Sequence, residues 1–401
     1  MPTFNEALFD SMVRHQIGIL RFSGGVRNQI WKLLDATERD LRIEIERRAG
    51  GAGFRTAAKR ERLRLMLSRL RESRLSGWRE VRKTWFAEMR DLAVAEAGFF
   101  DRIIAAAIPV QLGSVIPEAS ALRNIVTSRP FEGRLLSEHM SHLAAQDLGR
   151  IQSQVNIGLV QGEHPREIAR RIVGTASLRG RDGVTQITRF HAATIARTVA
   201  SGVASDAREL YLQANKDITP QKLFTATLDS RTTAICRGFD GQIFDVDDPA
   251  APVFPLHFGE RSLWSPIADG EVVGQRPRRD FTQRQLLREF TKANGLPVVT
   301  KRATLPRGTK RRFDEFARGR MRELTGRAPA RLTYNEFLRQ QTAANQADIL
   351  GPTRALLFRR GDLKLDKFVA FDGRELTLAE LASRHTDAFL RAGLDPALFA
   401  A

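Results

Sequence analysis

The chain has 401 residues, 42% of them hydrophobic, so it is long enough to form two or three folding units with buried cores. Its net charge of +18 would attract polyanions, which indicates nucleic acid or a strongly acidic protein surface as a partner. The alternative is that arginines only solvate exposed helix faces. A single cysteine excludes an intrachain disulfide and fits a reducing compartment. With neither a secretory n-region nor 18 consecutive apolar residues, export and membrane spanning are not expected.

Residues 1–128 are predicted to form a long helical hairpin. Apolar side chains recur at helical spacing from about residue 5 to 48 and again from about 57 to 107. Glycines at 50, 51 and 53 separate the two stretches, so the two helices are expected to pack antiparallel. The predicted stripes are Leu8, Met12, Ile19, Phe22, Val26, Ile30, Leu33, Leu41 and Ile45, and then Leu63, Leu67, Leu70, Trp78, Val81, Trp85, Met89, Leu92, Phe99 and Ile103.

The second of these helices carries two tryptophans, Trp78 and Trp85, seven positions apart on one face. A two-helix hairpin cannot cover both sides of a stripe that also contains Phe99 and Phe100. We therefore expect Trp78 and Trp85 to bind a protein partner. The alternative is that residues 132–215 fold back and bury the stripe.

Residues 129–215 are predicted to be helical, with helices near 132–161, 164–174 and 186–215. The stretch from 164 to 174 begins with Pro165 and ends at Gly174, the usual order for the start and end of a helix. His139 and His142 lie three apart and could share a ligand, but a solvated helix face is the favoured interpretation because nothing nearby supplies a third ligand.

Residues 216–270 have the only clear β character and are predicted to form a small α+β unit. The order is a strand ending in an aspartate turn, a short helix with the lone cysteine, an Asp-Gly turn into a short strand, and a proline-rich loop returning through a histidine. The residues that define this block are Asp229, Arg231, Thr232, Cys236, Asp240, Gly241, His257 and Arg261.

This block resembles the signature of the phage Mu F-like head morphogenesis (minor head protein) family, D-x-R-T-x-x-x-C, then D-G, then P-x-H-x-x-C-R. The chain departs from it at Glu260, where the family commonly has a cysteine, and its R-T-E-x-N pattern survives only as Arg197-Thr198. Further similarity lies in RPFEGRLLSEHM, in GLVQGEHPREIARRIVG and in the tail near LTYNEFLRQQ. The departures argue against any role that needs two cysteines.

The resemblance implies a minor head protein that acts in procapsid assembly, associates with the portal protein and with capsid or scaffold protein, and contacts packaged double-stranded DNA. It would be present in the host cytoplasm during assembly and then inside the phage head. Two alternatives remain open. One is a phage nucleic-acid-processing enzyme that uses a metal at Cys236 and His257, and the other is an internal protein that only condenses DNA.

No catalytic residue and no cofactor are expected, because the chain has no G-x-S-x-G, P-loop or dinucleotide motif. Asp229 is expected to cap a helix and Arg231 to pair with Asp229 or Asp240. Cys236, His257 and Glu260 are types of residue that bind zinc. The favoured interpretation is instead a buried thiol beneath a hairpin, with His257 hydrogen-bonded to its loop and no metal.

Residues 271–330 are predicted to be a basic linker with short helices, one near 281–293. Its cations are expected to contact DNA phosphates without reading bases, because few aromatic side chains alternate with them; the alternative is a solvated spacer kept extended by its charge. The candidate DNA-binding residues are Arg276, Arg278, Arg279, Lys301, Arg302, Arg307, Lys310, Arg311 and Arg312.

Residues 331–401 are predicted to be helical, with Thr333 and Glu336 forming a capping box and turns near Gly351, Gly361 and Asp372. The fold class expected for the whole chain is therefore mainly α: a long N-terminal hairpin, a helical middle, a small α+β signature unit, a basic linker and a helical C-terminal region.

Overall fold

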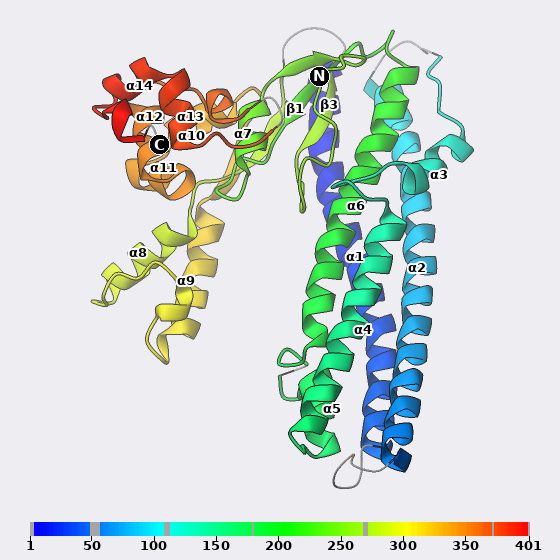
Figure 1. Ribbon diagram of the computed structural model, residues 1–401. Helices are drawn as coiled ribbons and strands as arrows, with labels where there is room; N and C mark the ends of the chain where they lie inside the picture. The colour runs from blue at the N-terminus through cyan, green and yellow to red at the C-terminus, as the bar shows by residue number, and fades with distance from the viewer. Residues whose placement is uncertain are drawn as a thin grey trace.

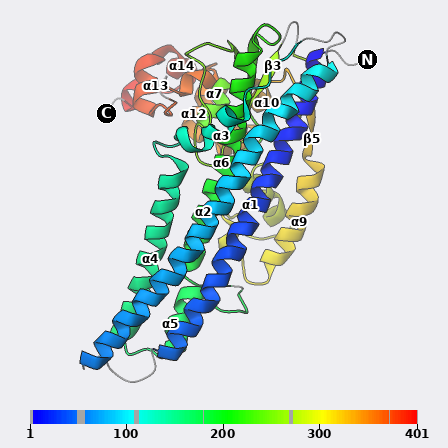
Figure 2. The same ribbon diagram turned by 90° about the vertical axis from the view of Figure 1, so that its right-hand side faces the viewer.

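A computed structural model describes residues 4–48, 57–107, 113–178, 180–267, 272–370 and 373–399. An elongated helical bundle forms one side of the molecule, and the C-terminal helices gather near one end of it (Figures 1 and 2). A small sheet lies between the two (Figure 1). The protein is mainly helical, as the sequence predicts.

The predicted hairpin consists of α1 (Phe4–Arg48) and α2 (Ala57–Ala107), which pack along their length. Most of the predicted stripe is buried, but its register shifts by one residue at three positions. The prediction places Leu33, Phe99 and Ile103 in the core, but these side chains are only partly buried. The core instead contains the residue that follows each of them, Leu34, Phe100 and Ile104. The side chain of Leu63 lies outside the described residues.

The middle of the chain completes the bundle. His164 caps the third of its helices, Pro165 occupies the first helical turn, and Gly174 follows the last residue with a φ of 77°. Residues 132–135, expected to be helical, form a turn instead, so the next helix begins at Leu136. The helices are α3 (Ala119–Ser128), α4 (Leu136–Val160), α5 (Pro165–Val173) and α6 (Thr185–Ala214).

The expectation that Trp78 and Trp85 bind a partner is wrong. Trp78 is 4% exposed and Trp85 is 0% exposed, because α4 and α6 fold back onto the hairpin. The indole Nε1–H of Trp78 donates to Asp147 on α4 at 3.0 Å. The tryptophans therefore stabilise the bundle core, as the fold-back alternative holds.

A buried ion pair lies inside the bundle. Arg74, which is fully buried, donates from Nε to Asp147 at 2.5 Å and from Nη1 to the hydroxyl of Thr37 at 2.6 Å. The other carboxylate oxygen of Asp147 accepts from Thr188 on α6 at 2.9 Å. Asp147 thus joins α2, α4 and α6 through one desolvated carboxylate.

Next comes a three-stranded antiparallel sheet in the order β2-β1-β3. Leu223 on the central strand pairs with Ile243 on one side and with Ser265 on the other. Beneath the sheet, Phe224, Phe254, Trp264 and Cys236 form an apolar core. The elements are β1 (Gln221–Thr225), α7 (Ala234–Phe239), β2 (Ile243–Asp245) and β3 (Leu263–Ile267).

The interpretation of residues 271–330 as a linker is wrong, because the described part of this region, residues 272–330, forms a folded layer. Two strands, 45 residues apart in the chain, pair in antiparallel register from Gln275 opposite Pro329 to Arg279 opposite Thr325. Phe290 and Phe313 pack in a separate apolar core between the helices. The elements are β4 (Gln275–Arg279), α8 (Gln283–Ala293), η1 (Arg302–Thr304), α9 (Thr309–Glu323) and β5 (Thr325–Pro329).

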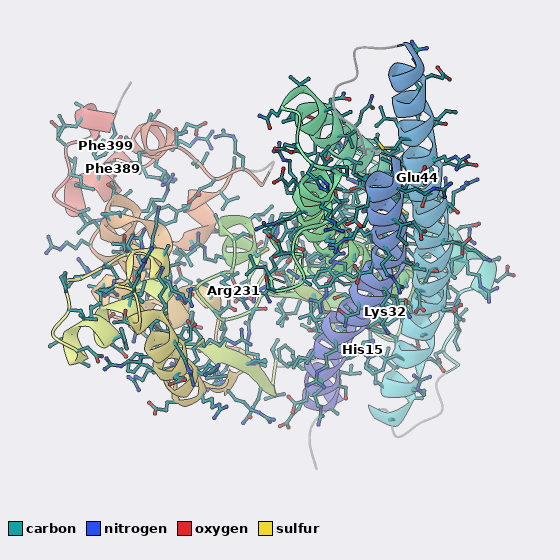
Figure 3. All side chains as sticks on the ribbon, turned by 90° about the horizontal axis from the view of Figure 1, so that it is seen from below. His15, Lys32, Glu44, Arg231, Phe389 and Phe399 are labelled. Atoms are coloured by element: carbon teal, nitrogen blue, oxygen red, sulfur yellow. The ribbon has the colours of Figure 1, made fainter. Side chains whose placement is uncertain are left out.

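The tail is helical, and Thr333 and Glu336 form the predicted capping box. Phe389 packs against Phe399 with ring centroids 5.3 Å apart (Figure 3). The predicted turn residue Asp372 lies outside the described residues. The elements are α10 (Tyr334–Arg339), α11 (Ala343–Leu350), α12 (Pro352–Arg359), η2 (Leu365–Phe368), α13 (Leu378–Arg384), α14 (Thr386–Arg391) and η3 (Pro396–Phe399). Within the described ranges, no helix has the length and apolar character needed to cross a membrane.

Candidate functional site

In the signature unit, residues 216–267, the predicted site residues form two separate polar clusters and a third group whose side chains could bind a metal. The first cluster is centred on Asp229, in the turn after β1. Its two carboxylate oxygens accept from the two terminal nitrogens of Arg261 at 2.7 and 2.8 Å. One of them also accepts from the backbone N–H of Arg231 at 2.9 Å. Asp229 therefore closes a turn and ties it to the start of β3.

The expected helix-capping role of Asp229 is wrong, because Thr233 is the residue that precedes α7. Arg231 does lie beside Asp229, at 3.4 Å, but its side chain is 66% exposed. Figure 3 places Arg231 between the helical bundle and the C-terminal helices. A bidentate pair with less exposed Arg261 is the stronger interaction, so Arg261 is the main partner of Asp229.

Although burial opposes ionisation, the charge and hydrogen bonds of Arg261 lower the pKa of Asp229 from 3.8 to about 2. A lowered carboxyl pKa stabilises the folded state above the unfolded pKa, and that stabilisation is lost as pH falls from about 4 towards 2. Asp229→Asn is expected to cost about 2 kcal/mol at neutral pH. Denaturant titration at pH 7 and at pH 2.5 should show this difference shrink in acid.

Asp247→Asn is the matched control, because Asp247 is an exposed carboxylate of the same unit with a side chain that is 69% exposed. It should change stability by less than about 0.5 kcal/mol. An Asp229→Asn penalty that stays constant from pH 7 to pH 2.5 would contradict the electrostatic account.

The second cluster is centred on Asp240, just after α7. Its carboxylate accepts from the backbone N–H groups of Ala226 and Tyr334, both at 2.6 Å, and from Arg276 at 2.7 and 3.1 Å. Gly241 follows with a φ of 85°, as the sequence predicts, and an added Cβ would lie 2.6 Å from Thr333. Asp240 thus anchors the signature unit to both β4 and α10.

Arg276 is therefore not available to DNA, and its assignment as a DNA-binding residue is wrong. It is 2% exposed, and both of its terminal nitrogens donate to Asp240 and to the carbonyl groups of Ala226 and Leu332. Arg278 is half-buried and pairs with Asp280 at 2.7 Å. The other candidates lie at the surface and remain a prediction: exposed Arg279, Lys301, Arg302, Arg307, Arg311 and Arg312, and half-buried Lys310.

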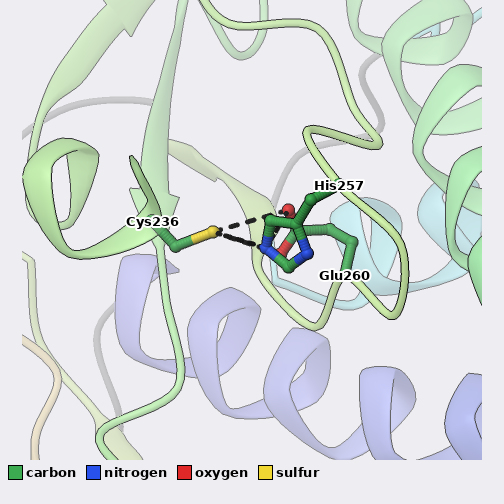
Figure 4. Close-up of side chains that lie close together, drawn as sticks. All are labelled: Cys236, His257 and Glu260. Carbon is green, nitrogen blue, oxygen red and sulfur yellow. Dashed lines mark hydrogen bonds and ion pairs between the residues drawn. The ribbon is translucent and has the colours of Figure 1, made fainter. Parts of the chain in front are cut away.

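The third group brings together Cys236 from α7 and two residues of the loop before β3, His257 and Glu260 (Figure 4). Cys236 and Glu260 are each 1% exposed. Burial and the neighbouring Glu260 raise the pKa of the Cys236 thiol to about 12. A protonated thiol is a poor nucleophile, so without a bound cation this cysteine is not activated for covalent catalysis.

Helix α6 braces the loop that carries this group. The hydroxyl of Thr198 accepts from the backbone N–H of Gly259 at 2.8 Å, and Ser201 donates to the carbonyl of Glu260 at 3.3 Å. In the sequence, Arg197-Thr198 is a remnant of a family pattern, but that pattern does not predict that Thr198 contacts this loop. The signal that could have indicated the contact is the row of polar side chains on one face of α6.

Comparison with known proteins identifies one family segment that covers part of this site. Residues 149–258 match the family model of the Phage Mu protein F like proteins, which confirms the resemblance over that segment. The segment includes Asp229, Cys236, Asp240 and His257 and ends before Glu260 and the tail. Searches among curated proteins and among solved structures returned no match.

Proposed function

From the Phage Mu protein F like segment at residues 149–258, we propose that this chain is a minor head protein that acts in phage head morphogenesis. The family suggests head morphogenesis and presence in the virion, and this match is the observation that carries the proposal. The geometry is compatible with a structural role, because Asp229 binds Arg261, 32 residues later, and Asp240 binds both Arg276 and Tyr334.

The proposed partners are the portal protein and a capsid or scaffold protein of the same phage. Contact with them must use surfaces other than the hairpin tryptophans, which lie in the core. The test is co-expression of tagged full-length protein with that portal protein, followed by affinity purification and gel filtration. We expect the two to co-elute. Portal rings that form normally and elute without this chain would contradict the proposed association.

The proposed contact with packaged DNA rests on the surface around η1 and the start of α9. Within the described part of the chain, Lys301, Arg307, Lys310 and Arg312 belong to no ion pair, whereas Arg302 pairs with Asp314 and Arg311 with Glu315. Unpaired cations on a folded layer can approach phosphates without first breaking a salt bridge. Binding would be independent of sequence, because it would involve the backbone alone.

Replacing Lys301, Arg307, Lys310 and Arg312 together with alanine is expected to weaken binding to all duplex sequences alike. Each neutralised phosphate contributes about 0.9 to the slope of log affinity against log salt, so loss of four contacts should flatten the slope by about 3.6 units. Fluorescence anisotropy across a salt series measures this slope.

The matched control removes the same charge from the exposed face of α2, with Arg69, Arg71, Arg79 and Lys83 changed to alanine. It should leave the slope within about 1 unit of the unmodified protein. An equal flattening in both variants would mean that only net charge matters. Failure of the unmodified protein to bind at low salt would remove DNA from its partners.

A further inference from the structure

The ligand atoms of Cys236, His257 and Glu260 all lie within 4.8 Å of one another. The side chain of Cys236 points toward those of His257 and Glu260 (Figure 4). Cys236 Sγ lies 3.2 Å from His257 Nε2 and 3.5 Å from each carboxylate oxygen of Glu260. His257 Nε2 lies 3.3 Å from Glu260 Oε2. All three separations are therefore similar, although the residues come from a helix and a separate loop.

These separations agree with the edges of a zinc coordination tetrahedron. Zinc binds sulfur at about 2.3 Å and nitrogen or oxygen at about 2.0–2.2 Å. At the tetrahedral angle, those bond lengths place sulfur about 3.5 Å from a nitrogen or oxygen ligand, and nitrogen about 3.4 Å from oxygen. A zinc ion would fit among the three atoms with shifts of only a few tenths of an ångström.

The surroundings hold each loop ligand in the orientation that a metal needs. His257 Nδ1 lies 3.0 Å from the carbonyl oxygen of Phe258, so Nδ1–H donates there and Nε2 presents its lone pair to the group. Glu260 Oε1 accepts from the backbone N–H groups of Arg261 and Ser262, both at 2.8 Å. Such outer contacts are typical of metal-ligating histidines and carboxylates.

The charge around Glu260 also favours a bound cation. Glu260 is buried, and the guanidinium of the adjacent Arg261 is directed to both oxygens of Asp229. Among the described residues, no lysine or arginine forms an ion pair with Glu260, whose ion-pair partner is His257. A buried carboxylate without a full cationic partner is costly, and a bound dication would offset that cost.

We propose that Cys236, His257 and Glu260 bind one structural Zn²⁺ ion that fastens α7 to the loop before β3. Binding would release the thiol proton of Cys236 to solvent, so that the ligands are thiolate, neutral imidazole and carboxylate. The thiolate selects zinc over magnesium or calcium. The hydroxyl of Thr233, 3.0 Å from His257 Nε2 and 3.2 Å from Cys236 Sγ, stands beside the fourth position. With this hydroxyl as the fourth ligand, the zinc would be surrounded by protein atoms alone, as in structural sites, whereas a hydrolytic site keeps an open position.

The first test is the zinc content of full-length protein purified without chelator, measured by elemental mass spectrometry. We expect about one zinc per chain, falling to less than about a tenth in Cys236→Ser and in His257→Gln. His142→Gln is the matched control, because His142 is an exposed histidine on α4, outside the group. It should retain its zinc. Zinc that persists in Cys236→Ser would overturn the proposal.

Cobalt substitution keeps the test decisive if the Cys236 variant does not fold. The chain has 1 cysteine, so a thiolate-to-cobalt charge-transfer band in the unmodified protein can come only from Cys236. We expect that band, together with the intense visible bands of tetrahedral cobalt, to appear at one equivalent. Their absence, with no zinc in the purified protein, would overturn the proposal.

Glu260→Cys provides a gain-of-affinity arm, because it installs a second thiolate in the same position. We expect this variant to keep one zinc per chain and to resist a competing chelator at least about tenfold better than the unmodified protein. Chelator resistance equal to that of the unmodified protein would show that position 260 is not a ligand. These outcomes are independent of whether the chain binds portal protein or DNA.

Discussion

Asp147→Ala is expected to destabilise the helical bundle by about 3–5 kcal/mol, because removing one partner of a buried ion pair leaves the other charge uncompensated. Arg74 is fully buried and donates to Asp147 at 2.5 Å. The same carboxylate also accepts from Trp78 and Thr188, so three donors lose their acceptor at once. Denaturant titration followed by circular dichroism measures the loss of helical stability.

Asp91→Ala is the matched control for this substitution, because Asp91 is exposed on α2. It should change the unfolding free energy by less than about 0.5 kcal/mol. If the two variants were equally stable, the buried carboxylate would not hold α2, α4 and α6 together.

Arg276→Met is expected to cost about 3–5 kcal/mol and to leave DNA affinity nearly unchanged at temperatures where the protein stays folded. Arg276 is buried, and it supplies the guanidinium that pairs with Asp240 at 2.7 Å. Methionine retains much of the side-chain volume but leaves the Asp240 carboxylate in the core without its cation. Thermal unfolding and anisotropy with duplex DNA separate the two effects.

Arg327→Met is the matched control. Arg327 lies exposed on the neighbouring strand β5, and its substitution removes the same charge as Arg276→Met. Its stability should stay within about 0.5 kcal/mol of the unmodified protein. The structural assignment of Arg276 fails if Arg276→Met is as stable as Arg327→Met but binds DNA several-fold more weakly.

Helical periodicity was enough to predict both helices of the hairpin, because a local pattern encodes which face is apolar. It could not decide between Leu33 and Leu34, which are adjacent and both apolar. The burial of Trp78 depended on contacts with α4 and α6, far along the chain. A stripe in one helix does not reveal how many other helices will cover it.

The prediction of a basic linker at residues 271–330 is wrong for a related reason. The strand Gln275–Arg279 has three arginines and a proline, so its sequence lacks the alternating apolar pattern of a half-buried strand. Its partner, β5, is separated from it by 45 residues, and the buried charge of Arg276 is balanced by Asp240 in the signature unit. Neither long-range pairing is visible in local composition.

At the signature unit, the sequence identified the residues but not their partners. The Asp-Gly turn predicted a positive φ at Gly241, which is confirmed. Asp229 was assigned to helix capping, whereas its main partner is Arg261, 32 residues later. For Cys236, His257 and Glu260, the sequence favours a buried thiol with no metal, and only the fold shows that their ligand atoms lie within 4.8 Å of one another.

The central claim, that this chain is a component of the phage head, is tested most directly by its presence in assembled particles. Procapsids of the phage would be purified by sedimentation, treated with protease to remove external protein, and analysed by quantitative mass spectrometry. We predict that the chain is retained in the particles, protected from protease, in far fewer copies than the major capsid protein. Its absence from procapsids and mature heads, while it accumulates free in the lysate, would contradict the account.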